Sequence, residues 1–253
     1  MIPPLDQRLD DTIALAREAG RLLRDRVDRT VNFQDAKDIK MQADVDTERL
    51  IRSRLAATGL PVIGEEQGGD ASLLDRDEDY WVVDPLDGTY NYLRGIPQTC
   101  VSIGLMRGRD AHLGVIYDFN ADECFAARRG GPLLLNGQPL QPAWPENRDH
   151  AVLITGFPAG RDYSTESLDR FIADIRRFKK IRMLGSAALA MAYVAAGRAD
   201  AYYEESINLW DIAAGIALVE AAGGTVQRHP STRPLAFDTW AVAHANWLET
   251  PVE

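Results

Sequence analysis

The chain has 253 residues and a formal net charge of −10, and its hydrophobic and charged fractions of 45% and 26% are ordinary for a globular protein. This length is enough for one large or two closely packed α/β units with a sizeable core. The acidic balance argues against a nucleic-acid-binding surface, and no apolar run approaches the roughly 20 residues of a membrane span.

The first half of the chain begins with two helix patterns and continues with short apolar runs. Apolar residues near helical spacing predict an amphipathic helix over residues 5–28 and a second helix over residues 44–57. Strands are expected at residues 61–64, 80–84, 99–107, 111–118 and 123–127. Asn136-Gly137 indicates a tight turn after them.

Prolines at positions 139, 142 and 145 make residues 138–149 the best internal boundary. Beyond it, strands at 151–155, 180–183 and 200–203 alternate with helices at 165–177, 186–196 and 211–222, and one more apolar strand is expected near 240–245. A strand-rich first half followed by alternation predicts packed α/β layers. We expect a single domain over 1–253, with an N-terminal half of about 1–140 and a C-terminal half of about 150–253.

The run Tyr80–Gly95, YWVVDPLDGTYNYLRG, joins an apolar strand to two carboxylates. Asp84 and Asp87 lie where the strand stops and a glycine turn begins. Pro85 favours an extended Asp84, and Gly88 allows a ligand to come close. Such a loop can direct two oxygen ligands at one point, as hard cations such as Mg²⁺ require, often together with substrate phosphates. The alternative is a polar turn after a buried strand, since Asp and Gly favour turns for local reasons.

Two further acidic positions are distant from this loop in the sequence. Glu65 follows the short apolar run Pro61–Gly64, and its alternative role is that of a solvated acidic loop. Asp211 opens a long apolar run of helical character, and its alternative role is that of a favourable carboxylate at a helix N-terminus. If the fold brings both to Asp84 and Asp87, repulsion and desolvation would cost on the order of several kcal/mol, which divalent cations would remove.

Three motifs, taken in their order and spacing, resemble the inositol monophosphatase family within the Mg²⁺-dependent, lithium-sensitive phosphatases. They are G-E-E at Gly64–Glu66, W-V-V-D-P-L-D-G-T-x-N at Trp81–Asn91 and W-D-x-A-A-G at Trp210–Gly215. Two further blocks, at Gly185–Ala188 and Ala199–Glu204, also match. The resemblance covers most of the chain. It implies an α/β fold with the five-layer α-β-α-β-α sandwich of the inositol monophosphatase and fructose-1,6-bisphosphatase type.

The same resemblance implies a phosphoric monoester hydrolase with two to three Mg²⁺ ions in each active site. One ion would be held by Glu65, Asp84 and the backbone carbonyl of Leu86. A second would be held by Asp84, Asp87 and Asp211, so that Asp84 bridges the two. A third, weaker ion would lie near Glu65.

Catalysis by a metal-activated water follows from the same resemblance, because no Cys, Ser or His stands at a motif position where a covalent phosphoenzyme would form. Glu65 and Thr89 would orient and deprotonate this water. Asp44 would accept a hydrogen bond from the Thr89 hydroxyl and relay charge. An additional role for Asp44 is the N-cap of a helix that begins at Val45.

A small-molecule phosphate monoester is the partner that the resemblance implies. Its contacts would come from Asp87, Gly88, Thr89, Ser186, Ala187, Glu204 and Asp211. The backbone N–H groups of Gly88 and Thr89 would hold phosphate oxygens. Glu204 would accept a hydrogen bond from a hydroxyl of inositol, and its alternative role is a surface carboxylate after an apolar strand.

Departures from the family pattern leave the metal ligands intact but bear on the substrate. Lys40–Asp44 stands for V-T-x-A-D, Tyr90–Tyr92 for Thr-Asn-Phe, and Arg94-Gly95 for His-Gly. The leading substrate is inositol monophosphate or a related small polyol or sugar phosphate. The alternatives are histidinol phosphate, fructose 1,6-bisphosphate or 3′-phosphoadenosine 5′-phosphate, or a non-catalytic member of the family. Arg94 either meets a second anionic group or pairs with a surface acid, and we expect the surface pair.

Cys100 and Cys124 lie in apolar, strand-like runs and are expected to be small core residues and not a disulfide. The N-terminus MIPPLDQRLDD has no apolar core of a signal peptide, so a cytoplasmic location is expected. Family resemblance implies a homodimer, and neither nucleic acid nor membrane is expected as a partner.

Overall fold

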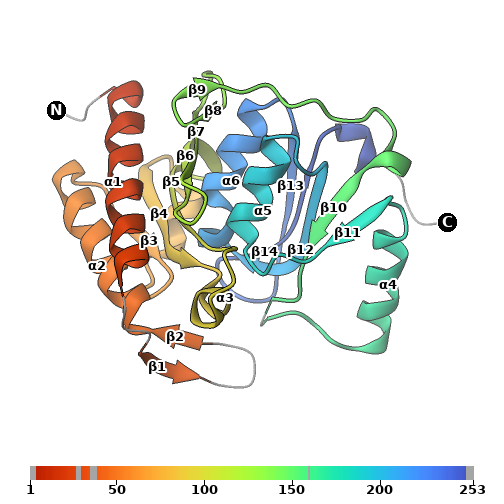
Figure 1. The fold of residues 1–253 in the computed structure, drawn as a ribbon, viewed down its shortest axis with the longest axis horizontal. Helices are drawn as coiled ribbons and strands as arrows, with labels where there is room; N and C mark the ends of the chain where they lie inside the picture. Colours follow the sequence, from red (N-terminus) through yellow and green to blue (C-terminus); the bar gives the residue numbers. More distant parts are fainter. Residues whose placement is uncertain (1–3, 27–29, 35–38, 159, 249–253) are drawn as a thin grey trace.

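The computed structural model of the chain describes residues 4–26, 30–34, 39–158 and 160–248. Its layers, in order, are α1 (Leu5–Asp25) with α2 (Gln42–Leu55), a seven-stranded sheet, α5 (Ala187–Ala195) with α6 (Leu209–Ala221), a five-stranded sheet, and α4 (Thr165–Ile175) (Figure 1). This is the five-layer α-β-α-β-α order that the resemblance implies, and that prediction is confirmed.

The seven-stranded sheet uses only residues of the first half. Its order is β3 (Val62–Gly64), β4 (Asp79–Asp87), β5 (Cys100–Arg107), β6 (Asp110–Asp118), β7 (Glu123–Arg128), β8 (Leu134–Leu135) and β9 (Gln138–Pro139). β3 runs parallel to β4, and the other neighbours are antiparallel. Successive side chains of β4 alternate between two cores, with Trp81 packing towards α1 and α2 and Tyr80 towards α5 and α6.

The outer face of this sheet is covered by α1 and α2. Apolar side chains at helical spacing form the buried stripe of α1, which includes Leu9, Ala16 and Leu23. α1 ends at Asp25, and positions 27 and 28 of the predicted helix lie outside the described residues. α2 begins at Gln42, so the N-cap role expected for Asp44 is wrong. A two-stranded ribbon of β1 (Val31–Gln34) and β2 (Ile39–Met41), which the apolar pattern does not predict, precedes α2.

The middle layer, α5 and α6, is apolar on nearly every side because it lies between two sheets. Close packing here depends on small residues. A Cβ atom at Gly114 of β6 would lie 2.1 Å from the carbonyl oxygen of Ala214 in α6, so glycine lets the helix and the sheet approach. This contact helps to fix α6 and, with it, Asp211 in the first turn of that helix.

The second sheet has the order β11 (Lys180–Arg182), β10 (Val152–Thr155), β12 (Ala201–Asn208), β14 (Ala236–Val242) and β13 (Thr225–Pro230). β10 is parallel to β11 and β12, whereas β14 is antiparallel to β12 and β13. On its outer face, Phe171 of α4 packs in one core with Tyr203 and Trp247.

The expected elements are present with shifted ends, and the turn at Asn136-Gly137 joins β8 and β9 with φ angles of 50° and 78°. The short strands β8 and β9, strand β13 and the short helix α3 (Thr89–Arg94) are additional to the prediction. Short 3₁₀ turns lie at Ala56–Thr58, Ala71–Asp75, Arg148–His150 and Ala245–Trp247.

Two smaller expectations concern the cysteines and membranes. Cys100 and Cys124 are buried free thiols, as expected. None of the helices in the described ranges has the length and apolar character needed to cross a bilayer.

Candidate active site

Asp84 and Asp87 lie at the C-terminal end of β4, where its register with β5 shifts between the two residues. Such an irregularity re-aims side chains at the end of a strand. The N–H of Leu86 donates to Asp84 Oδ1 at 3.0 Å. Gly88 then adopts a φ of 87°, and a Cβ atom there would lie 2.6 Å from the carbonyl oxygen of Gln98. Glycine is therefore required at this turn, from which the chain enters α3.

The carboxylate of Asp87 is fixed by the N-terminus of α5. Its Oδ2 accepts hydrogen bonds from Ser186 Oγ at 2.5 Å and from the N–H of Ala188 at 2.7 Å. Ser186 is also the N-cap of α5, since its Oγ accepts from the N–H of Leu189. A residue of the first sheet is thus held by a helix of the second half.

Asp211 completes the first group of carboxylates. It lies in the first turn of α6, where its Oδ2 accepts from the N–H of Asn208 at 3.0 Å in a capping box. One oxygen from each of Asp84, Asp87 and Asp211 lies within 4.8 Å of the others. The expectation that these carboxylates meet is therefore realised in the fold.

A second group consists of Asp44, Glu65 and Glu66, whose oxygens also lie within 4.8 Å of one another. Thr89 Oγ1 donates to Asp44 Oδ1 at 3.0 Å, as the family resemblance implies, and lies 3.1 Å from the carbonyl oxygen of Leu86. Asp44 Oδ2 is buried and has no hydrogen-bond partner among the described residues. Glu66 belongs to a recognised motif, but its membership of this group was not anticipated.

The loop that carries Glu65 and Glu66 is held by a buried side chain of α2. The Glu48 carboxylate accepts the N–H of Glu66 at 2.7 Å and the N–H of Gln67 at 3.1 Å. Arg52 donates to Glu48 Oε1 at 2.7 Å and also to the carbonyl oxygens of Val62 and Gly68. In the sequence Glu48 and Arg52 look like an ordinary i, i+4 surface pair, so only the fold reveals this function.

Proximity and burial raise the pKa values of these groups. Burial, opposed by the Thr89 hydrogen bond, raises the pKa of Asp44 to about 7. Burial and the neighbouring Asp87 charge raise the pKa of Asp211 to about 7. The pKa of Asp84 is raised well above its ordinary value by burial first and by the Glu65 charge second. Each shift expresses the free-energy cost of crowding anions away from water.

This donor set fits hard divalent cations such as Mg²⁺. The potential ligand atoms are carboxylate and carbonyl oxygens, which Mg²⁺ prefers. The unpartnered oxygen of Asp44 and the mutual repulsion of the two groups both point to added positive charge. The acidic groups therefore have the composition of a metal site.

A pocket of about 300 Å³ opens beside the two groups. It is lined by Glu65, Asp87, Gly88, Thr89, Tyr90, Gly156, Phe157, Pro158, Gly185, Ser186, Ala187, Glu204, Ile207, Asn208 and Asp211. All the residues expected to contact substrate belong to this lining, whereas Asp44, Asp84 and Leu86 do not. Glu204 is only 8% exposed and accepts no hydrogen bond from a described residue. The surface alternative for Glu204 is therefore wrong.

Two aromatic side chains at this pocket were not anticipated. Tyr90 and Phe157 line it and are 56% and 42% exposed. Tyr90 stands at a position where the sequence departs from the family pattern, which was an available signal, but Phe157 lies in a segment without a recognised motif. Arg94 is exposed and is not part of the lining, but it forms no salt bridge among the described residues, so the expected pair with a surface acid is wrong.

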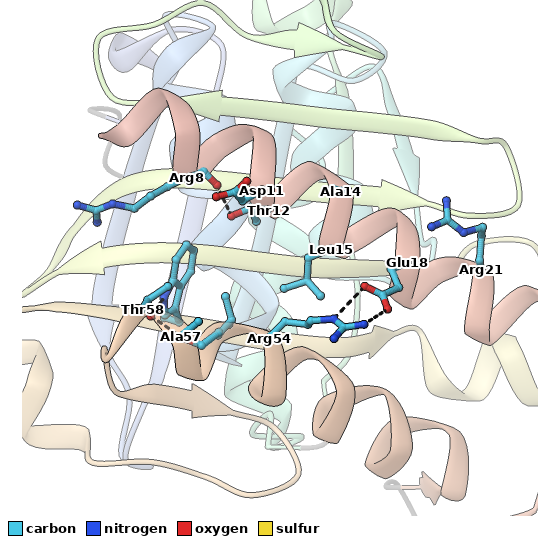
Figure 2. A pocket seen from close by; sticks show the side chains of 12 residues that line it. Arg8, Asp11, Thr12, Ala14, Leu15, Glu18, Arg21, Arg54, Ala57 and Thr58 are labelled. Atoms are coloured by element: carbon cyan, nitrogen blue, oxygen red, sulfur yellow. Dashed lines mark hydrogen bonds and ion pairs between the residues drawn. The ribbon is translucent and has the colours of Figure 1, made fainter. Parts of the chain in front are cut away.

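Another cavity, of about 500 Å³, lies between α1 and the C-terminal end of α2 (Figure 2). Its lining includes Leu15, Leu55 and Trp81 and also Arg54 and Glu18, which form an ion pair (Figure 2). It shares no lining residue with the pocket of about 300 Å³ beside the two acidic groups.

Comparison with known proteins agrees with the geometry. The model of the inositol monophosphatase family matches residues 5–251. The "Nus factor SuhB" of Xylella fastidiosa is 39% identical over 85% of this chain and 79% of its own, and the "Inositol-1-monophosphatase" of Mesorhizobium japonicum is 37% identical over 86% and 84%. The solved structure of inositol monophosphatase from Anabaena (Nostoc) superposes with a TM-score of 0.81 at 30% identity, covering 96% of this chain and 93% of that one.

The family match spans nearly the whole chain, and the acidic groups and the adjoining pocket have the chemistry that such phosphatases require. The chain belongs to the inositol monophosphatase family and is a phosphoric monoester hydrolase.

Proposed function

We propose that this protein is a Mg²⁺-dependent phosphatase that hydrolyses inositol monophosphate or a closely related polyol phosphate. The observation that supports it most is a pocket lined both by members of the two acidic groups and by the carboxylate of Glu204. A phosphate beside cations and an alcohol beside Glu204 would place both parts of such a substrate. The relative from Mesorhizobium japonicum carries the name of this activity.

Residues that would hold Mg²⁺ are Glu65, Asp84, the carbonyl group of Leu86, Asp87 and Asp211, with two ions in the leading arrangement and a third, weaker one near Glu65. When bound, the ions neutralise phosphoryl oxygens and make water more acidic. Hydrogen bonds already orient three of these carboxylates, through Leu86 for Asp84, α5 for Asp87 and Asn208 for Asp211. Such outer contacts hold ligand oxygens in place before an ion arrives.

Proton transfer is assigned to Thr89 and Asp44. The Thr89 hydroxyl donates to Asp44 Oδ1, so it could accept a proton from water while its own proton passes to the Asp44 carboxylate. Glu65 lines the same pocket and would share in orienting this water. Asp44 is buried and lies outside the pocket lining, so it acts through the hydroxyl and not on the substrate.

Recognition divides between the phosphate and the alcohol. Gly88 and Thr89 line the pocket, and their backbone N–H groups would meet phosphate oxygens. Glu204, Asp87 and Asp211 would accept hydrogen bonds from hydroxyl groups of the alcohol. Ser186 Oγ is already bonded to Asp87 and to the N–H of Leu189, so its contribution would be indirect, while Ala187 would offer its backbone.

Phosphate release from a panel of monoesters, with Mg²⁺ and with EDTA, tests this proposal. The panel holds inositol 1-phosphate, several sugar phosphates, histidinol phosphate, fructose 1,6-bisphosphate and 3′-phosphoadenosine 5′-phosphate. We expect metal-dependent release that is fastest from inositol 1-phosphate. A different best substrate would replace the assignment and keep the site, and release that EDTA does not stop would reject the metal chemistry. An Asp84→Asn preparation, purified in parallel, excludes a contaminating phosphatase.

A further inference from the structure

One wall of the substrate pocket is formed by the segment that follows β10. Gly156, Phe157 and Pro158 line the pocket together with Glu204. Gly156 lies so close to Glu204 that a Cβ atom would be 2.5 Å from its Oε1. The backbone of this segment therefore limits where the carboxylate of Glu204 can lie.

The buried side chain of Arg161 packs against Phe157, which is part of this wall. Its side chain has no solvent exposure, and its guanidinium group lies over the rings of Phe157 and Phe171, at 5.1 and 4.5 Å from the ring centroids. Its Nη1 lies 3.2 Å from Glu205 Oε2, and its Nη2 donates to the carbonyl oxygen of Ser167 at 3.4 Å. A buried guanidinium needs such partners because an uncompensated charge is costly, so these contacts tie Phe157 to α4 and to β12.

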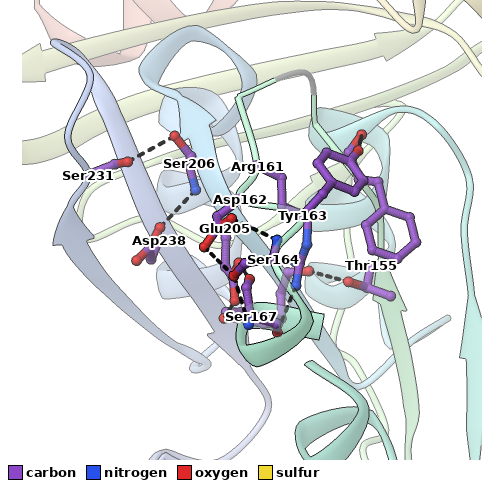
Figure 3. A network of polar contacts seen from close by, with 12 residues as sticks. Thr155, Arg161, Asp162, Tyr163, Ser164, Ser167, Glu205, Ser206, Ser231 and Asp238 are labelled. Atoms are coloured by element: carbon purple, nitrogen blue, oxygen red, sulfur yellow. Dashed lines mark hydrogen bonds and ion pairs between the residues drawn. The ribbon is translucent and has the colours of Figure 1, made fainter. Parts of the chain in front are cut away.

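The partner of Arg161 is the residue after Glu204. The Glu205 carboxylate also accepts hydrogen bonds from Tyr203 Oη at 2.8 Å and from Ser167 Oγ at 3.2 Å. Figure 3 shows Glu205 with Arg161 and Ser167, and Ser206, the next residue in the chain, with separate contacts to Ser231 and Asp238. The neighbours of Glu204 in β12 are thus held from the side away from the first sheet.

The strand itself is irregular at this point. The register of β12 with β14 shifts between Glu204 and Ile207, and Ser206 has a φ of 55°. Its N–H donates to Asp238 Oδ1 and its hydroxyl contacts Ser231, both at 2.8 Å (Figure 3). A bulge of this kind re-aims the adjacent side chain, and a positive φ at a non-glycine residue persists only where the surroundings fix it.

We propose that Arg161 is a specificity-determining positioning residue for the alcohol part of the substrate. It fixes Phe157 at the pocket wall and, through Glu205, the strand segment that directs Glu204 into the pocket. The inference rests on the proposed function, because it assumes that Glu204 receives a substrate hydroxyl. Arg161 itself contacts neither acidic group nor the pocket, so it affects recognition of the alcohol and leaves the phosphate chemistry intact.

The planar guanidinium is required for this role. Lysine could restore a charge beside Glu205, but it could not pack a flat group over two rings while donating to a carbonyl oxygen. Arg161→Lys is therefore expected to recover only part of the function that Arg161→Met loses. Arg170 of α4, which is 60% exposed and pairs with Glu166, provides the matched control through Arg170→Met.

Steady-state kinetics on two phosphate esters separate an effect on recognition of the alcohol from an effect on the phosphate chemistry. The first is inositol 1-phosphate, or the polyol or sugar phosphate that the wild type hydrolyses best, and the second is p-nitrophenyl phosphate, whose leaving group has no hydroxyl for Glu204. In Arg161→Met we expect KM for the polyol ester to rise about tenfold, the loss typical of a displaced hydrogen bond to a charged group, with kcat nearly unchanged. Both parameters should stay at the wild-type level for p-nitrophenyl phosphate, and Arg170→Met should change neither ester.

A double-mutant cycle with Glu204→Gln tests whether Arg161 acts on the substrate through Glu204. If Arg161 acts through Glu204, the effect of Arg161→Met on KM should largely disappear in the Glu204→Gln background. Equal losses on both esters, full additivity, or no change in either ester would overturn the proposal. Should Arg161→Met fail to fold, Glu205→Gln takes its place with the same expectation, because it removes the ion pair with Arg161 at a residue outside the pocket lining.

The two proposals fail in different ways. A wild type that prefers another hydroxyl-bearing ester rejects inositol monophosphate as substrate but leaves the Arg161 comparison valid on that ester. A wild type that hydrolyses no polyol or sugar phosphate better than p-nitrophenyl phosphate rejects the role of Arg161 as well.

Discussion

The carboxylate of Glu48 accepts the backbone N–H of Glu66 at 2.7 Å, so a side chain without solvent exposure fixes the loop that presents Glu65. Arg52 closes the arrangement by donating to Glu48 and to the carbonyl oxygen of Gly68. Even the adjacent turn depends on it, because a Cβ atom at Gly64 would lie 2.6 Å from Glu48 Oε1. One helical turn of α2 thus orients a ligand of the candidate metal site.

Glu48→Gln should weaken Mg²⁺ binding, because the amide can satisfy fewer of the three donors that Glu48 accepts. We expect the half-saturating Mg²⁺ concentration to rise about tenfold, the usual effect of losing a contact behind a metal ligand. Calorimetric titration of the purified protein with Mg²⁺ measures this without reference to turnover. Glu166→Gln, which alters an exposed helical carboxylate, is the control. Unchanged Mg²⁺ affinity in Glu48→Gln would contradict the role assigned here.

Asp84→Asn should remove phosphatase activity without loosening the fold. We expect kcat to fall by about a thousandfold or more, since we propose that this carboxylate is a ligand of both ions. In EDTA the variant should be at least as stable as the wild type, because burial and the Glu65 charge raise the pKa of Asp84 and its removal relieves repulsion. Thermal unfolding in EDTA, together with an assay in Mg²⁺, checks both statements. Turnover near the wild-type rate would contradict the proposal that Asp84 is a metal ligand.

Gly88→Ala should be far more damaging than an equivalent change elsewhere. Gly88 has a φ of 87° and its Cβ atom would meet the carbonyl oxygen of Gln98, whereas Gly130 has a φ of 73° with nothing within 4 Å. Gly130→Ala should cost about 1 kcal/mol from backbone strain alone, and Gly88→Ala should cost about 2 kcal/mol or more and abolish activity. Urea denaturation of both variants measures the difference, and equal costs would show that the Gln98 contact is unimportant.

Asp79 should make the free energy of unfolding depend on pH in the acid range. Burial works to raise its pKa, but hydrogen bonds from Arg107 and Arg8 outweigh burial and hold the pKa below its ordinary value. A lowered pKa means that the stabilisation is present above the unfolded-state pKa of about 3.9 and is lost as the pH falls through the folded-state value. Asp79→Asn should therefore cost about 1 kcal/mol at pH 7 and nothing once Asp79 is protonated. Urea denaturation at a series of pH values tests this, and a cost that persists in acid would refute it.

The metal-ligand candidates could be predicted because each is attached to a strong local signal. Asp84 and Asp87 follow an apolar strand and precede a glycine turn, and Asp211 opens an apolar helix. Matching these motifs to a family was then enough to place them together. The five-layer order followed from the same match, while the alternation of strands and helices predicted only packed layers.

The supporting residues could not be predicted, because their role depends on three-dimensional contacts. Glu48 and Arg52 have the spacing of any exposed helical pair, although the fold buries Glu48 beneath the loop of Glu66. Arg161 occurs in a polar stretch with no periodicity, so nothing in the sequence indicates a fully buried guanidinium. β13 has a mixed polar composition and is recognisable only through its pairing with β14.

The connection over residues 140–149 separates the carboxylates of the site in the sequence. Glu65, Asp84 and Asp87 come before it and Glu204 and Asp211 after it, while α6 packs against strands of both sheets. A chain cleaved in this connection would therefore give two fragments, neither with a complete set of ligands. Phosphatase turnover would then report reassembly of the two fragments, which makes this connection a natural site at which to build a split-enzyme sensor of protein association.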